Sequence, residues 1–317
     1  TGRQQPATGS GQGRGALTEI SDAHEGMGDR MGVFPPQLYL IGAQKAGTTS
    51  LAYLLDQHPD IAVSNPKEAG FFSQHYDEGL DWYRRCFPQD LPAVLADAST
   101  GYTMAAVAGA PVLKAADGAA DSVARRIKKH APAARFIYVL RDPVDRTVSA
   151  YRHDQRAGRI GRASLREAVT AAPFYADVSR YWRQIAPFLD HFPRDRFLFI
   201  DFAALSADPA GVARQCIAFA GLDPDKAPLA LGEPKNAAFQ FNGLGRRFFD
   251  LFPDERAASR FVSAAKRLTP APVHRMAKAA MTRQAAPVSQ ADRDWLAGLF
   301  ASENPAMEAL AGFRFYR

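Results

Sequence analysis

A glycine-containing turn between a short apolar run and a helical pattern constrains the fold more than any other feature of the sequence. Residues 37–41 are almost entirely apolar and predict a buried strand, and the turn 42–47 follows at once. Leucines at helical spacing over 48–57 predict a helix. A strand, a tight turn and a helix in direct succession are typical of α/β proteins, in which the helix N-terminus binds anions through its free backbone N–H groups.

The same order of elements recurs farther along the chain. Residues 119–130 predict an amphipathic helix, 136–140 an apolar strand, and Asp142-Pro143 the start of another helix. Residues 196–200 predict a third strand, followed by a helix over 209–220. Strands that are apolar throughout and alternate with helices predict a P-loop-like α/β fold, a parallel sheet flanked by helices on both faces.

The organisation of the chain follows from its composition. Residues 1–34 are rich in Gly, Gln, Ser and Asp and lack a hydrophobic period, so they predict a flexible leader. Since 47% of the chain is hydrophobic, residues 35–317 are long enough to fold as a single domain. After about residue 240 the pattern is helical, which predicts a helical C-terminal extension.

Charge and cysteine content leave several classes open. The 39 Lys and Arg against 33 Asp and Glu suit nucleotides, phosphosulfates or acidic glycans, and suit nucleic acid as well. Cys86 and Cys216 are too few for a disulfide framework and predict buried thiols. No apolar run approaches the roughly 18–20 residues of a membrane span. We therefore expect a cytoplasmic protein, or one of the Golgi lumen if an N-terminal anchor was removed.

The first turn differs from an ATP-binding loop in the place of its lysine. A Walker loop has Lys and then Ser or Thr after its last glycine, whereas Thr48 follows Gly47 here and the lysine comes earlier, at Lys45. A phosphosulfate carries less charge at the transferred group than a triphosphate, so a lysine with hydroxyl and amide donors can bind it without Mg²⁺. The alternative is a structural connection that binds nothing.

The string IGAQKAGTTS, residues 41–50, resembles the 5′-phosphosulfate loop of sulfotransferases that use 3′-phosphoadenosine-5′-phosphosulfate (PAPS), particularly the heparan-sulfate and related carbohydrate enzymes and their bacterial relatives. By that resemblance Lys45 contacts the phosphosulfate and its bridging oxygen. The same resemblance implies that the 5′-phosphate is held by the residues that follow, which are Ala46, Gly47, Thr48, Thr49 and Ser50.

A second phosphate motif lies in FIYVLRDPVDRTVSAY, residues 136–151. Arg141 stands at the carboxyl end of an apolar strand, where open α/β sheets bind their ligands, and Ser149 follows about two helical turns later. A guanidinium fork and a hydroxyl suit phosphate, although Arg141 could instead pair with Asp142 or Asp145. The Arg-Asp-Pro and Ser spacing resembles the 3′-phosphate site of sulfotransferases, and the two motifs together carry the resemblance.

Two residues are candidates for the general base. Glu68, in NPKEAGFF, resembles the glutamate that heparan-sulfate sulfotransferases place two residues before a Phe-Phe pair. Its alternative is a solvated carboxylate paired with Lys67. His153, one turn beyond Ser149, resembles an acceptor-side histidine of the N-sulfating enzymes, and a surface histidine is its alternative.

The resemblance covers about residues 37–222 and departs from the family at three points. Ala98 stands where many of those enzymes have a lysine, and Gly70 stands where a histidine often precedes the Phe pair. A cysteine-bounded Lys-Gly-Arg loop is missing after residue 230, where Lys235, Arg246 and Arg247 are only vague substitutes.

The resemblance implies in-line transfer of a sulfuryl group from PAPS to a hydroxyl or amino group of a glycan or small-molecule acceptor. The product is 3′-phosphoadenosine-5′-phosphate (PAP), and neither a metal nor a nucleic-acid partner is expected. A P-loop nucleotide kinase is one alternative, and it would need a lysine at Thr48. A non-catalytic protein that binds nucleotides or glycans is the other, and it would leave Glu68 without a role.

Overall fold

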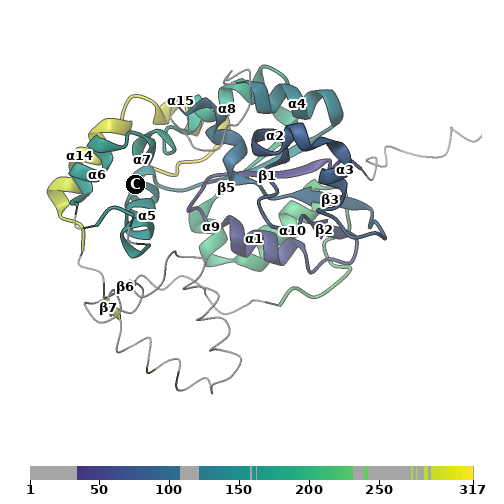
Figure 1. Cartoon of the computed structure of the whole chain (residues 1–317), viewed down its shortest axis with the longest axis horizontal. Helices are drawn as coiled ribbons and strands as arrows, with labels where there is room; N and C mark the ends of the chain where they lie inside the picture. Colours follow the sequence, from purple (N-terminus) through teal and green to yellow (C-terminus); the bar gives the residue numbers. More distant parts are fainter. Residues whose placement is uncertain are drawn as a thin grey trace, which may run out of the picture.

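The computed structural model in Figure 1 describes residues 34–107, 121–157, 159–161, 163–230, 239–241, 282–284 and 287–316, together with 273 and 276. The predicted leader lies outside these ranges except for its last residue. Lys235, Arg246 and Arg247 also lie outside them. In the described part of the chain, no helix is both long enough and apolar enough to cross a bilayer.

Five parallel strands form the central sheet in the order β2-β3-β1-β4-β5, which confirms the predicted fold class. The three strands predicted from apolar runs are β1 (Leu38–Gly42), β4 (Arg135–Leu140) and β5 (Phe197–Asp201), each within one residue of its expected bounds. The sequence did not indicate β2 (Ile61–Val63) and β3 (Val94–Asp97). They are too short to show a hydrophobic period. In the sheet, β3 pairs with β1 and β2 pairs with β3.

Helices cover both faces of this sheet (Figure 1). One face carries α1 (Thr48–Leu55), α9 (Phe202–Ala207) and α10 (Pro209–Phe219). The other carries α2 (Phe71–Gln74), α4 (Ser122–His130) and α8 (Tyr181–Leu189). The core between these layers is apolar and includes both cysteines, which are free thiols as predicted.

The long helix after β4 starts a second apolar cluster beside the sheet. It is α5 (Pro143–Arg156), and it packs with α6 (Leu165–Ala171), α7 (Phe174–Asp177) and α14 (Gln290–Phe300). The last helix, α15 (Asn304–Ala311), lies against α8. Short elements complete the described fold, namely η1 (Tyr76–Glu78), α3 (Gly79–Arg84), η2 (Thr100–Ala106) and η3 (Arg194–Arg196).

The described part of the C-terminal extension contains two short strands besides its helices. Antiparallel strands β6 (Phe239–Phe241) and β7 (Thr282–Gln284) form a two-stranded ribbon. Each strand has three residues, and its partner lies far away in the sequence, so neither leaves a local period that would indicate it. Helices α14 and α15 agree with the prediction.

All five strands of the sheet are parallel, so their carboxyl ends meet at one edge. The loops after β1, β3, β4 and β5 therefore share that edge, and β1 and β4 are direct neighbours. This topology brings the two phosphate motifs, which follow β1 and β4, side by side.

Candidate functional site

The turn between β1 and α1 has a backbone that requires glycine at its end. Gly47 is the N-cap of α1 and has φ 78°, a left-handed conformation that favours glycine. A side chain there would also come within 3.1 Å of Leu205 and Phe202 in α9. Ala46 is fully buried, while Thr49 and Ser50 are exposed at the start of α1. The first N–H groups of this helix have no partner inside the helix, which suits an anion.

Lys45 sits in this turn with a left-handed backbone, φ 69°. A lysine rarely adopts that conformation, so the surroundings must hold it. Its carbonyl oxygen accepts a hydrogen bond of 2.9 Å from Nη1 of Arg141. Burial lowers the pKa of the Lys45 ammonium, and the positive charge of Arg156 lowers it further, while Asp154 opposes the shift. The lysine therefore lies in a cationic environment.

Arg141 links the two phosphate motifs. It follows β4, its guanidinium lies 4.5 Å from the ring centroid of Phe202, and its own carbonyl accepts a 2.8 Å hydrogen bond from the hydroxyl of Tyr181. Its Nε is buried and has no hydrogen-bond partner in the described ranges. Arg141 thus binds the backbone of Lys45 through Nη1, and its Nε donor has no hydrogen-bond partner among the described residues.

The structure gives the neighbouring aspartates other partners than Arg141. Asp142 caps α5 by accepting a 2.8 Å hydrogen bond from the backbone N–H of Asp145, and Asp145 forms an ion pair of 2.8 Å with Arg293. Burial lowers the pKa of Arg141, and the charges of Asp145 and Asp142 oppose that shift. The contacts therefore do not support the alternative in which Arg141 only pairs with its neighbours.

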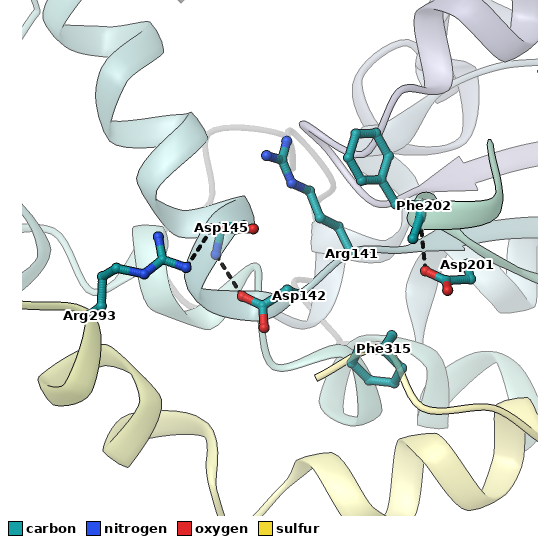
Figure 2. Close-up of a pocket in the computed structure, with 8 residues that line it drawn as sticks. Arg141, Asp142, Asp145, Asp201, Phe202, Arg293 and Phe315 are labelled. Atoms are coloured by element: carbon teal, nitrogen blue, oxygen red, sulfur yellow. Dashed lines mark hydrogen bonds and ion pairs between the residues drawn. The ribbon is translucent and has the colours of Figure 1, made fainter. Parts of the chain in front are cut away.

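Arg141 also lines a cavity of about 170 Å³ (Figure 2). Three carboxylates line it, from Asp142, Asp145 and Asp201, together with Arg293. Carboxylates repel phosphate, so this cavity does not suit a nucleotide phosphate. Within the described residues, no group of three or more His, Cys, Asp or Glu side chains could hold a metal ion.

One face of α5 borders the turn that carries Lys45. Ser149 and His153, both half-buried, follow each other at helical spacing on that face. Burial lowers the pKa of His153, and the positive charge of Lys45 lowers it further. The structure thus brings His153 into the electrostatic range of Lys45 and favours its neutral, proton-accepting form.

Glu68 lies on a different loop of the same sheet edge, between β2 and α2. Its Oε1 is 3.2 Å from the Nζ of Lys67, and its Oε2 accepts a 3.1 Å hydrogen bond from Thr100. The Lys67 pair is the contact expected of a solvated carboxylate, and the side chain is 48% exposed. Its backbone, however, is left-handed with φ 64°, and each oxygen is held by a separate donor. Such a fixed carboxylate remains a candidate base.

A buried carboxylate anchors the loop that carries Glu68. Asp97 is fully buried and accepts hydrogen bonds from Tyr83 (2.6 Å), Ser99 (2.5 Å) and Tyr102 (2.6 Å). Ser99 in turn accepts a 2.9 Å bond from the backbone N–H of Gly70. Burial raises the pKa of Asp97, and these three donors oppose the rise. The network ties β3 to the segment between Glu68 and α2.

We expect Tyr102→Phe to lower the free energy of unfolding by about 1.5–3 kcal/mol, because it removes one donor from a buried carboxylate. Denaturant unfolding followed by circular dichroism measures this change. Tyr53→Phe is the matched control, since Tyr53 is 49% exposed, and it should change stability by less than about 0.5 kcal/mol. Equal stability of the two variants would show that the Asp97 network does not support the loop.

The predicted residues thus form two groups. Lys45 and Arg141 lie at the ends of β1 and β4, and His153 on α5 is in electrostatic range of Lys45, with Ser149 one turn before it. Glu68 lies with the loops after β2 and β3. A 3.1 Å hydrogen bond from Thr103 in η2 to the carbonyl of Ile41 connects the second group to β1.

Sequence reasoning missed two residues that contact the candidate site residues. Thr100 and Phe202 gave no local signal, because their contacts with Glu68 and Arg141 form only in the folded chain.

Residues 36–226 match the model of the sulfotransferase family. A mouse heparan sulfate glucosamine 3-O-sulfotransferase 3A1 is 28% identical over 66% of this chain and 53% of its own length. A human bifunctional heparan sulfate N-deacetylase/N-sulfotransferase 3 is 30% identical over 60% of this chain and 22% of its own length. The chain therefore spans about half of the first relative and about a fifth of the second.

A solved sulfotransferase from Alicyclobacillus acidocaldarius has a similar fold, with a TM-score of 0.60 and 24% sequence identity. The match covers 88% of this chain and 97% of that one. At this identity the similarity supports the fold, and the function has to be argued from the site.

Proposed function

Because this chain belongs to the sulfotransferase family, we propose that it transfers a sulfuryl group from PAPS to a hydroxyl or amino group of a carbohydrate or small-molecule acceptor. The observation that carries the proposal is the 2.9 Å hydrogen bond from Arg141 to the carbonyl of Lys45. It joins the turn assigned to the 5′-phosphosulfate with the motif assigned to the 3′-phosphate. A ligand with phosphate groups at both positions is the one that needs both motifs at once.

The donor is held by the residues around the ends of β1 and β4. The α1 N-terminus, with Gly47, Thr48, Thr49 and Ser50, supplies N–H and hydroxyl donors to the 5′-phosphate. Arg141 and Ser149 supply a guanidinium fork and a hydroxyl to the 3′-phosphate. Ala46 is buried beneath the turn and keeps its backbone in place. These contacts orient the sulfur for attack from the side of the acceptor.

In the reaction, an acceptor oxygen or nitrogen forms a bond to sulfur while the bond from sulfur to the 5′-phosphate oxygen breaks. Lys45 stabilises the negative charge that grows on that leaving oxygen. The acceptor proton passes to a general base, for which we propose Glu68, with His153 as the second candidate. PAP then leaves with the electron pair of the broken bond.

Glu68 and His153 are supported as candidate general bases by different observations. Glu68 has a carboxylate whose two oxygens are held separately by Lys67 and Thr100. His153 lies in the electrostatic range of Lys45, and its lowered pKa keeps it neutral at physiological pH. The acceptor and its O- or N-linkage belong to the proposal as well, and the cytoplasmic location expected from the sequence stays a prediction.

We expect PAP to raise the melting temperature of the protein, because a ligand that binds only the folded state stabilises it by mass action. ATP with Mg²⁺ should raise it far less, since Arg141 and Ser149 would have no 3′-phosphate to bind. Differential scanning fluorimetry with equal concentrations of PAP, ATP and 5′-AMP measures the three shifts. Stabilisation by ATP that equals or exceeds that by PAP would favour a nucleotide kinase instead.

A further inference from the structure

Arg146, in the first half of α5, is a fully buried arginine that forms no ion pair within the described ranges. Its Nε donates a 2.6 Å hydrogen bond to Oγ of Ser179, and its Nη2 donates to the carbonyl of Tyr175. Its Nη1 is buried and has no hydrogen-bond partner among the described residues. Both groups that it contacts are uncharged. Burial lowers the pKa of Arg146 to about 10, so the side chain is still a cation at neutral pH.

Such a burial is costly, because a charge removed from water normally finds a counter-ion inside the protein. In the part of the chain that the structure describes, no carboxylate forms an ion pair with Arg146. Tyr138 and Tyr181 are the polar neighbours that favour its charged form, and Arg141 opposes it. Among the described residues, the charge of Arg146 is therefore buried and is not neutralised by an ion pair.

The position of Arg146 points to the anion that would neutralise it. Arg146, Ser149, His153 and Arg156 occupy positions i, i+3, i+7 and i+10 of α5, which lie on one face of a helix. Tyr181 connects Arg146 to the start of this helix, because it neighbours Arg146 and its hydroxyl donates a 2.8 Å hydrogen bond to the carbonyl of Arg141. Besides burial, the charges of Arg156 and Arg146 lower the pKa of Lys45 in the turn after β1. Arg141, which precedes the helix, is bonded to that turn directly.

We propose that Arg146 is a positioning residue for the anionic donor. The positive charge of Arg146 raises the affinity of the neighbouring Lys45 and Arg141 site for phosphate, although Arg146 does not contact the donor itself. This inference rests on the proposed function, since it takes the bound anion to be the phosphates of PAPS or PAP. A buried cation costs free energy in the free protein, and a phosphate nearby removes part of that cost on binding. The positive charges of Arg146, Arg141 and Lys45 together then favour the binding of an anion at the turn after β1.

A purely structural role is the competing explanation, because the two hydrogen bonds of Arg146 also attach α5 to α7 and the residues after it. Thr147 makes the same kind of attachment without a charge. Its Oγ1 lies 2.8 Å from Oγ of Ser179 and donates a 2.8 Å bond to the carbonyl of Pro143. Thr147 is fully buried as well, so Thr147→Val is a matched control that weakens the attachment and leaves the charge.

The test compares Arg146→Met, Arg146→Lys and Thr147→Val with the wild type. Isothermal titration calorimetry gives the Kd of PAP and of 5′-AMP, and the melting temperature without ligand reports on the fold. We expect Arg146→Met to weaken PAP binding by about ten-fold or more, since a unit charge near two phosphates is removed. The loss for 5′-AMP, which has one phosphate, should be smaller. Arg146→Lys keeps the charge and should bind PAP within about three-fold of the wild type.

Thr147→Val should melt at a lower temperature and bind both ligands as the wild type does. The inference is overturned if Arg146→Met binds PAP with wild-type affinity, or if it loses PAP and 5′-AMP equally. If Arg146→Met does not fold, the PAP affinity of Arg146→Lys tests the inference. A ten-fold loss of PAP affinity in Arg146→Lys would overturn it, because the guanidinium geometry would then matter rather than the charge. Failure of the wild type to bind PAP at all would instead overturn the donor assignment, and the inference with it.

Discussion

Replacement of Lys45 by methionine is expected to lower kcat of sulfuryl transfer by about 10²–10³-fold, the loss typical of one preorganised group that stabilises transition-state charge. Methionine keeps the length of the side chain and removes the ammonium that we propose stabilises the leaving phosphate oxygen. The backbone of the turn should survive, because Arg141 holds it through the Lys45 carbonyl and not through the side chain. Steady-state kinetics with PAPS and an acceptor that the wild type sulfates measure the change.

The control is Lys129→Met, which removes an exposed lysine from α4 and should leave kcat within about two-fold. The pH profile gives a second readout. Because burial and Arg156 lower the pKa of Lys45, its ammonium is lost at a lower pH than that of an ordinary lysine. PAP affinity should therefore fall as pH rises through that pKa, and Lys45→Met should lack this fall. A variant that keeps most of the wild-type kcat would remove Lys45 from the mechanism.

Glu68→Gln is expected to lower kcat by about 10²–10⁴-fold if the carboxylate accepts the acceptor proton. Glutamine keeps the shape and one acceptor oxygen, so Thr100 can still bond to it, while the basic charge is gone. The Kd of PAP should stay near the wild-type value, because Glu68 belongs to the loop after β2 and not to the donor turn. Single-turnover kinetics and calorimetry with PAP separate the two effects.

His153→Ala, measured in parallel, decides between the two candidate bases. The true base gives the larger loss of kcat with intact PAP binding. If His153 is the base, the rate should rise with pH through a pKa below that of ordinary histidine, because burial and Lys45 both lower it. Glu78→Gln, on the exposed turn η1, is the matched carboxylate control and should leave both kcat and PAP binding unchanged. Retention of most turnover by Glu68→Gln would move the base to His153.

That the two phosphate motifs lie side by side was predictable, because the signals for their strands are local. Each phosphate motif directly follows an apolar run, and both runs are central strands of the sheet, β1 and β4. A buried parallel strand must be apolar on both sides, so such strands stand out in a sequence. The motifs that follow them then share one edge by topology alone.

The rest of the site depends on contacts between distant parts of the chain. Phe202 supports Arg141 from the start of α9, and Thr100 reaches Glu68 from η2. Neither residue type indicates its role locally. Strands β2 and β3 are only three and four residues long, and they form by pairing with other strands: β3 pairs with β1, and β2 pairs with β3. The ribbon of β6 and β7 pairs segments that no short window of sequence contains.

The most direct test of the central claim is transfer of label from ³⁵S-PAPS to a panel of glucosamine-containing oligosaccharides and small hydroxyl or amino compounds. The wild type should label at least one acceptor, release PAP in equal amount, and lose this activity in Lys45→Met. No transfer to any acceptor, from a protein that binds PAP tightly, would contradict the assignment as an enzyme and leave a nucleotide-binding protein in its place.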